Sequence, residues 1–146
     1  RSDKGYGSEQ AQLLGSRFTG GSEHTQARFG ERLEVQLEVE VDASVEAPHL
    51  IFDILDTKGL QVSGRRIPLA PGAAGGRQRV DVGFEAQLQR GVYRLRLRLV
   101  DAPSLERTTI LARQEGGLSF EVVDDSRERF TGLFPLPMDV RVGPPA

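Results

Sequence analysis

The stretch Glu31-Arg32-Leu33-Glu34-Val35-Gln36-Leu37-Glu38-Val39-Glu40-Val41 decides the fold of this chain. Aliphatic residues occupy every second position from residue 33 to residue 41, and polar residues fill the positions between them. Because successive side chains of a β-strand point to opposite faces, this alternation predicts a long strand with one buried face. A helix would scatter the same aliphatic residues around its circumference, so the pattern argues against a helix.

A second copy of the pattern lies far downstream. Tyr93 and three leucines, at positions 95, 97 and 99, alternate with Arg94, Arg96 and Arg98. Two half-buried strands need something to cover their apolar faces, and the chain carries few helix signals. The most economical cover is a second sheet, so the sequence predicts an all-β sandwich.

Composition limits the possible functions. The chain has 146 residues and a net charge of −2, with charges of both signs mixed along its length. This mixture does not favour nucleic acid or an anionic membrane as a partner, because both select clustered Lys and Arg. The absence of cysteine excludes disulfides and thiolate metal sites. No apolar run approaches the roughly 20 residues of a membrane helix, and we expect no signal peptide.

Turn residues divide the rest of the chain into further strands. We expect strands over residues 9–18, 31–42, 49–56, 60–67, 77–87, 92–101, 117–124 and 136–142. Residues 1–8 are predicted to be a linker, residues 68–76 a Pro/Gly/Ala loop and residues 143–146 a tail, while residues 102–116 give no clear signal. A total of about seven to nine strands is typical of an immunoglobulin-like or jelly-roll β-sandwich.

An immunoglobulin-like order divides these strands between two sheets. The first sheet would contain residues 9–18, 31–42 and 77–87, and the second would contain residues 60–67, 49–56, 92–101 and 117–124. Arg94, Arg96 and Arg98 would then lie on the outer face of the second sheet, beside Asp53 and Glu121. The glutamates of residues 34–40 would lie on the outer face of the first sheet.

Motifs for catalysis or cofactor binding are weak. The glycine-rich segment at residues 72–76 lacks the Lys-Ser/Thr ending of a phosphate-binding loop. His24 and His49 have no metal-type partners at usable spacing, and no Gly-x-Ser-x-Gly elbow is present. We therefore predict no catalytic residue, no metal and no cofactor. A hydrolase with two facing carboxylates remains a minor alternative.

The arginine row has two interpretations that the residues alone leave open. Guanidinium groups spread over a sheet could hydrogen-bond sugar hydroxyls in a bidentate manner. The same groups could instead form cross-strand ion pairs with Asp53 and Glu121. Trp is absent and only two Tyr are present, which argues against a flat aromatic platform for stacking sugars.

An ordered set of segments carries a family resemblance. The segments are Gly5-Tyr6-Gly7-Ser8-Glu9, Phe29-Gly30-Glu31-Arg32-Leu33-Glu34-Val35, Ala47-Pro48-His49-Leu50-Ile51-Phe52-Asp53-Ile54-Leu55-Asp56-Thr57-Lys58-Gly59, Leu88-Gln89-Arg90-Gly91-Val92-Tyr93-Arg94-Leu95, Leu118-Ser119-Phe120-Glu121-Val122 and Gly132-Leu133-Phe134-Pro135-Leu136-Pro137. In this order they resemble the carbohydrate-binding C-terminal domain of Wzt-type ATPases, the nucleotide-binding subunits of O-antigen polysaccharide ABC transporters.

The resemblance implies a domain organisation and a function. Residues 9–142 would form a non-catalytic carbohydrate-binding sandwich, joined through residues 1–8 to a preceding ATPase domain. The expected partners are an O-antigen-type polysaccharide, a second copy of the chain with exchanged C-terminal strands, and a membrane transporter subunit, with no role for nucleic acid. The expected location is the cytoplasm, peripheral to the inner membrane. Residues 63–66 depart from the Gly-x-Asn-type segment that the family often has, so recognition of a capping group is not carried over.

Two sets of residues follow as expectations. We predict that the outer face of the second sheet contacts the glycan through Asp53, Gln61, Ser63, Arg65, Arg94 and Arg96. Residues 130–142 are too apolar for a free tail, and their prolines suit an edge or a crossing arm, so we predict that this arm mediates dimerisation. The alternative to glycan binding is an immunoglobulin-like module with a structural or protein-interaction role.

Overall fold

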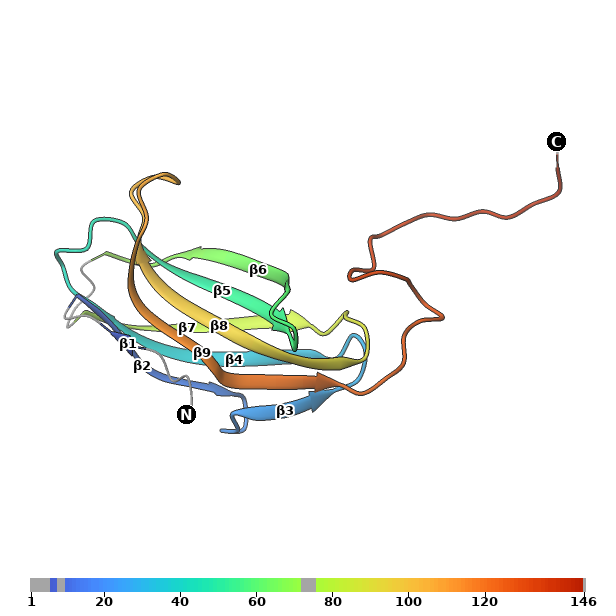
Figure 1. The fold of residues 1–146 in the computed structure, drawn as a ribbon, viewed down its shortest axis with the longest axis horizontal. Coiled ribbons are helices and arrows are strands. Elements are labelled where there is room, and N and C mark those ends of the chain that lie inside the picture. The colour runs from blue at the N-terminus through green and yellow to red at the C-terminus, as the bar shows by residue number, and fades with distance from the viewer. Residues whose placement is uncertain (1–5, 8–9, 72–75, 146) are drawn as a thin grey trace.

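The chain forms two β-sheets packed face to face (Figure 1), in a computed structural model that describes residues 6–7, 10–71 and 76–145. The strands are β1 (Tyr6–Gly7), β2 (Ala11–Phe18), β3 (His24–Ala27), β4 (Arg32–Val41), β5 (Pro48–Asp56), β6 (Gln61–Pro68), β7 (Arg77–Glu85), β8 (Gly91–Asp101) and β9 (Thr109–Val122). The described residues include no helix, and hence none long and apolar enough to cross a membrane. The predicted all-β sandwich is confirmed.

The division of strands between the sheets also follows the prediction. The smaller sheet has the order β2-β4-β7, and the larger has the order β1-β9-β8-β5-β6. Two short strands were not predicted. β3, which lies between the predicted strands at residues 9–18 and 31–42, pairs in parallel with the end of β9, and β1 pairs with β9 inside the expected linker. The other residues of the linker, residues 72–75 of the predicted loop and Ala146 of the tail lie outside the described residues.

The core lies between the two sheets and has the predicted phase. Leu33, Val35, Leu37, Val39 and Val41 are all buried, whereas Glu34 and Glu38 between them are exposed. Phe120 from β9 is the centre of an aromatic cluster. Its ring centroid lies 5.4 Å from that of Tyr93 and 5.5 Å from that of Phe84, so it joins the two sheets. Burying a side chain of this size contributes about 1.5–3 kcal/mol to stability.

A tight turn fixes the register of β5 and β6. Asp56 Oδ1 accepts hydrogen bonds from the backbone N–H groups of Lys58 and Leu60, each at 2.9 Å. Gly59 has φ of +87°, a left-handed conformation that glycine adopts without the steric cost of a Cβ. This turn joins the strands predicted at residues 49–56 and 60–67 into a hairpin.

A bulge in β9 brings a stretch without clear sequence signals to the middle of the larger sheet. Arg94 pairs with Ser119 and Arg96 with Glu115, so between these two pairs β9 contains two more residues than β8. Gly116 in the bulge has φ of +81°. Because the number of extra residues is even, Glu115 and Ser119 both face outward. Part of the stretch at 102–116 is thus the first half of β9.

The predicted strand at 136–142 is absent, because no neighbouring strand of the same chain lies beside it. Gln89 donates hydrogen bonds to the carbonyls of Phe130 and Gly132, which holds the base of this segment on the sandwich, and residues 133–145 extend away from it as an arm (Figure 1). Its large apolar side chains are more than half exposed: Leu133, Phe134, Leu136, Met138, Val140 and Val142. From residue 134 to residue 142 the apolar residues alternate with Pro135, Pro137, Asp139 and Arg141, which is the pattern of a strand that lacks a partner.

Candidate functional site

The outer face of the larger sheet is a grid of cross-strand rows, because residues directly opposite each other on paired strands share a face. One row contains Gln61, Leu55, Arg94, Ser119 and His24, the next contains Gly64, Asp53, Arg96 and Glu115, and the third contains Arg66, Ile51, Arg98 and Arg113. The alternation of β8 therefore places its three arginines in three adjacent rows.

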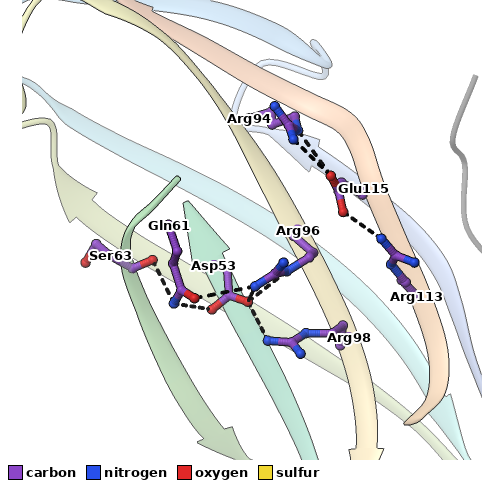
Figure 2. Close-up of polar contacts among 8 residues, drawn as sticks. All are labelled: Asp53, Gln61, Ser63, Arg94, Arg96, Arg98, Arg113 and Glu115. Carbon is purple, nitrogen blue, oxygen red and sulfur yellow. Dashed lines mark hydrogen bonds and ion pairs between the residues drawn. The ribbon is translucent and has the colours of Figure 1, made fainter. Parts of the chain in front are cut away.

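Asp53 is the buried centre of the first polar cluster (Figure 2). Its Oδ2 accepts hydrogen bonds from Arg96 Nε at 3.0 Å, Arg96 Nη2 at 2.7 Å and Arg98 Nη2 at 2.6 Å. Its Oδ1 accepts a hydrogen bond from Gln61 Nε2 at 2.9 Å. Asp53 is only 1% exposed, so it holds the arginines in place beneath the surface and does not itself face solvent.

Glycine at position 64 makes room for this cluster. A Cβ at Gly64 would lie 2.5 Å from Asp53 Oδ1 and 2.7 Å from Gln61 Nε2. Both distances are too short for a carbon atom, so any side chain would push Gln61 or the Asp53 carboxylate away. Gly64, in the segment Ser63-Gly64-Arg65-Arg66, is thus a residue that shapes the site.

Glu115 is the centre of the second cluster (Figure 2). It accepts hydrogen bonds from Arg113 Nη2 at 2.8 Å and from Arg94 Nη2 at 3.1 Å. The hydrogen bond from Arg113, with a smaller contribution from Arg94, holds the pKa of Glu115 below its ordinary value of 4.5 against the opposing effect of burial. Arg94 Nη1 also donates to the carbonyl of Asp56 at 3.0 Å, which ties the cluster to the β5–β6 turn.

The two clusters leave an excess of positive charge. Three guanidinium groups of β8, those of Arg94, Arg96 and Arg98, contact two carboxylates, those of Asp53 and Glu115, and Glu115 also contacts Arg113. Arg66 adds a further exposed cation, for which the described residues provide no hydrogen-bond or ion-pair partner. This face therefore offers unused donors and unneutralised charge.

On the outer face of the smaller sheet, by contrast, the arginines of β7 contact carboxylates, which neutralise their charge. Its glutamate row on β4 lies opposite arginines of β7, with Glu40 paired to Arg77 at 3.5 Å in register and Glu38 opposite Arg79. Arg79 also contacts Asp81 at 3.0 Å, and these pairs are more than one third exposed. Charges of opposite sign thus alternate across this face.

The predicted glycan contacts separate into two groups. Asp53, Gln61, Arg94 and Arg96 come together on the outer face, although Asp53 is covered by the arginines. Ser63 and Arg65 lie on the opposite face of β6, because a register shift next to Ile54 pairs them with the inward residues Ile54 and Phe52.

Sequence reasoning missed three residues of the site: Arg66, Arg113 and Glu115. Arg98 was placed in the outward arginine row but was not among the predicted glycan contacts, although it has the same alternation signal as Arg94 and Arg96. The β9 bulge determines the positions of Arg113 and Glu115, and no sequence pattern predicts this bulge. The expected pairing of Glu121 with the arginine row was wrong, since Gln26 donates to Glu121 at 3.4 Å and Glu115 pairs with Arg94.

A second concave feature lies between the edges of the two sheets. Its floor is apolar, with Phe52, Ile54 and Ile67 from the larger sheet and Val80, Val82 and Phe84 from the smaller one. Ser63, Arg65 and Asp81 line its rim, and its volume is about 310 Å³. Among the described residues, β6 and β7 each pair with one strand only, so an unpaired strand edge borders the cleft on both sides.

The described residues contain no group of three or more His, Cys, Asp or Glu side chains that could hold a metal ion. His24 Nδ1 lies 2.5 Å from Ser119 Oγ, on the exposed end of the larger sheet. Within the described part of the chain, no hydrogen bond joins His24 to a carboxylate, so this pair lacks the third member of a nucleophilic triad.

Comparisons with known proteins agree on one family. The family model described as the Wzt C-terminal domain matches residues 2–136. The solved structure described as the crystal structure of the C-terminal domain of wzt has a TM-score of 0.71 and 14% identity, and the match covers 98% of this chain and 93% of that chain. Pseudomonas fluorescens alkylpurine DNA glycosylase AlkC has a TM-score of 0.48 at 12% identity over 77% of this chain and 31% of that chain, which is too low to support any inference. No curated protein matches the chain.

Proposed function

The chain belongs to the Wzt C-terminal domain family, the C-terminal domain of an ABC transporter subunit, and on this premise we propose that it is a non-catalytic carbohydrate-binding domain that recognises an O-antigen-type polysaccharide for export. In the full-length protein it would follow an ATPase domain joined through residues 1–8. It would act in the cytoplasm, at the inner membrane, through a membrane transporter subunit.

The observation that supports this proposal is the arginine grid on the outer face of the larger sheet. Arg96 and Arg98 are held by Asp53 and still expose about a quarter of their side chains, 23% and 25% respectively. Prepositioned guanidinium forks suit the vicinal hydroxyls of a sugar, and a sheet face is broad enough for a long chain. Each such contact contributes about 1 kcal/mol, so we expect weak binding spread over several residues.

The arm supports the further proposal that the chain is a homodimer. Its alternating apolar side chains have no cover in the single chain, while the cleft between β6 and β7 is apolar and bordered by unpaired strand edges. An arm from a second copy could add a strand to β7 and place its apolar face in the cleft. Exchange between identical chains would cover both features at once.

A polysaccharide titration tests glycan binding. The probe is the surface polysaccharide purified from the strain that encodes this chain, followed by NMR of the ¹⁵N-labelled protein. We expect shifts of amides in β5, β8 and β9, weaker binding by Arg96→Ala and unchanged binding by Glu40→Ala on the smaller sheet. Amide shifts around Glu40 on the smaller sheet, without shifts around the arginines of the larger sheet, would show that the glycan binds the smaller sheet instead.

The same titration separates the alternatives. A structural or protein-interaction module would give no shifts on either face. A hydrolase would shorten the polysaccharide during a long incubation, which size-exclusion chromatography detects. Binding without shortening supports the proposed role.

A further inference from the structure

We propose that the outer face of the larger sheet selects an acidic polysaccharide, whose carboxylate or phosphate groups dock over Ile51 between Arg66 and Arg98. This inference rests on the proposed function and adds the chemical class of the glycan to it. The two arginines flank a single position of β5, both are partly exposed, and arginines outnumber carboxylates around Asp53.

The two arginines flank one residue. Ile51 on β5 pairs with Arg66 on β6 and with Arg98 on β8, so all three side chains lie in one row on the outer face. Neighbouring strands are about 4.8 Å apart, which places the two arginine backbones about 10 Å from each other. Each side chain is long enough to reach halfway, so one oxyanion above Ile51 can contact both. Ile51 offers no competing hydrogen bond.

The donors of this pair are incompletely used. Arg98 gives one Nη2 hydrogen bond to Asp53 at 2.6 Å, and a quarter of its side chain (25%) is exposed to solvent. The exposed part of the guanidinium group can therefore donate to an incoming acceptor. Arg66 is exposed and has no side-chain partner among the described residues. In contrast, Arg94 already contacts Glu115 and the Asp56 carbonyl.

Charge distinguishes an anion from a neutral sugar. A hydroxyl oxygen could satisfy the free N–H groups, but it would leave the excess charge of the face in place. A carboxylate or phosphate both accepts the hydrogen bonds in bidentate geometry and neutralises the charge. The chain as a whole has a net charge of −2, so the excess on this face is local and is not a consequence of a basic protein.

The smaller sheet supplies an internal comparison. Its outer face also carries arginines, but Glu40, Asp81 and other carboxylates alternate with them. If the arginines of the larger sheet served only to stabilise the strands, the same balance would be expected there. We infer that the imbalance on the larger sheet serves the bound glycan.

Chemical neutralisation of the polysaccharide tests the inference. The probes are three preparations of the strain's own surface polysaccharide: native, carboxyl-reduced and dephosphorylated with hydrofluoric acid. We expect the native form to bind with an affinity that falls as salt rises from 20 to 300 mM, because added ions screen the charges. We expect one of the two treatments to weaken binding about tenfold, and that treatment identifies the anionic group.

The outcomes separate the inference from the proposed function. Equal binding of all three preparations, or binding by a polysaccharide that contains neither group, overturns the acidic class and leaves carbohydrate binding intact. Absence of binding by the native polysaccharide overturns both.

A matched pair of variants locates the site. Arg66→Gln removes a cation from the edge strand β6, and Arg17→Gln removes an exposed cation from β2, the edge strand of the smaller sheet. For neither arginine do the described residues provide an ion pair, so both variants should keep the melting temperature. We expect Arg66→Gln to weaken binding of the native polysaccharide about fivefold, as loss of about 1 kcal/mol implies. Binding of the neutralised form should not change, and Arg17→Gln should bind as the wild type does. Equal affinities of the two variants for the native form would overturn the placement.

Discussion

Arg96 donates two hydrogen bonds to the same oxygen of Asp53, from Nε at 3.0 Å and from Nη2 at 2.7 Å. The Asp53 side chain is 2% exposed and the Arg96 side chain 23% exposed, so the acid lies below the arginine in the sheet. This arrangement changes the expected role of Asp53. The carboxylate positions the guanidinium groups, and the guanidinium groups form the surface that a ligand meets.

Replacing Asp53 should therefore weaken the fold. Asp53→Asn leaves Arg96 and Arg98 without their shared carboxylate, and we expect the free energy of unfolding to fall by about 2–4 kcal/mol. The control is Asp81→Asn, which removes an exposed ion pair with Arg79 and should cost less than about 1 kcal/mol. Urea unfolding measures both. Similar losses for the two variants would contradict the structural role of Asp53.

Strand β4 provides a test of the core. Leu37 is 1% exposed, and Leu37→Asp would bury an unpaired carboxylate between the sheets. We expect a loss of about 4 kcal/mol or more, sufficient to unfold the domain. Glu38→Ala on the exposed face should be nearly neutral. Thermal denaturation followed by circular dichroism compares them, and equal shifts would refute the phase of β4.

The Glu115 cluster predicts a pH dependence of stability. The hydrogen bond from Arg113 lowers the pKa of Glu115 in the folded protein, whereas the unfolded chain has the ordinary value of 4.5. The stabilisation is therefore complete above pH 4.5 and is lost as the pH falls through the lower folded pKa. We expect wild type to be more stable than Glu115→Gln near pH 6, with the two curves converging below pH 4.5. A difference that stays constant with pH would contradict the assignment.

Removing the arm tests dimerisation. Deletion of residues 130–146 should give a monomer or an insoluble product, because the cleft between β6 and β7 loses its proposed cover. Leu136→Asp should weaken the dimer in the same way, while Asp139→Ala on the other face of the arm should leave it intact. Light scattering gives the mass of each variant. A truncated protein that remained a well-folded dimer would exclude the arm as the interface.

The long strands and their partition between sheets could be predicted from the sequence, since period-two alternation directly reports which face is buried. β4 and β8 have this signal over their whole length. The turn at residues 56–59 also has a local sequence signal, because Asp56 and Gly59 occupy the positions that the turn requires. Local chemistry determines all of these features.

The remaining features depend on contacts between distant residues. β3 is four residues long and gains its strand conformation only by pairing with β9, and the β9 bulge depends on how Gly116 and Gly117 meet β8. A single register shift determines on which side of β6 Ser63 and Arg65 lie. The sequence of β6 has no alternation that would predict this shift. For the same reason, Glu115 was not recognised as part of the site.

The place of β9 in the chain has a consequence for synthesis on the ribosome. β9 is the last strand, yet it pairs with β1, β3 and β8, and its Phe120 joins the aromatic residues of both sheets. Until Val122 has left the exit tunnel, β3 lacks its neighbour and the edge of β8 is uncovered. We expect the nascent domain to stay incomplete through most of its translation and to need protection from aggregation until its final strand emerges.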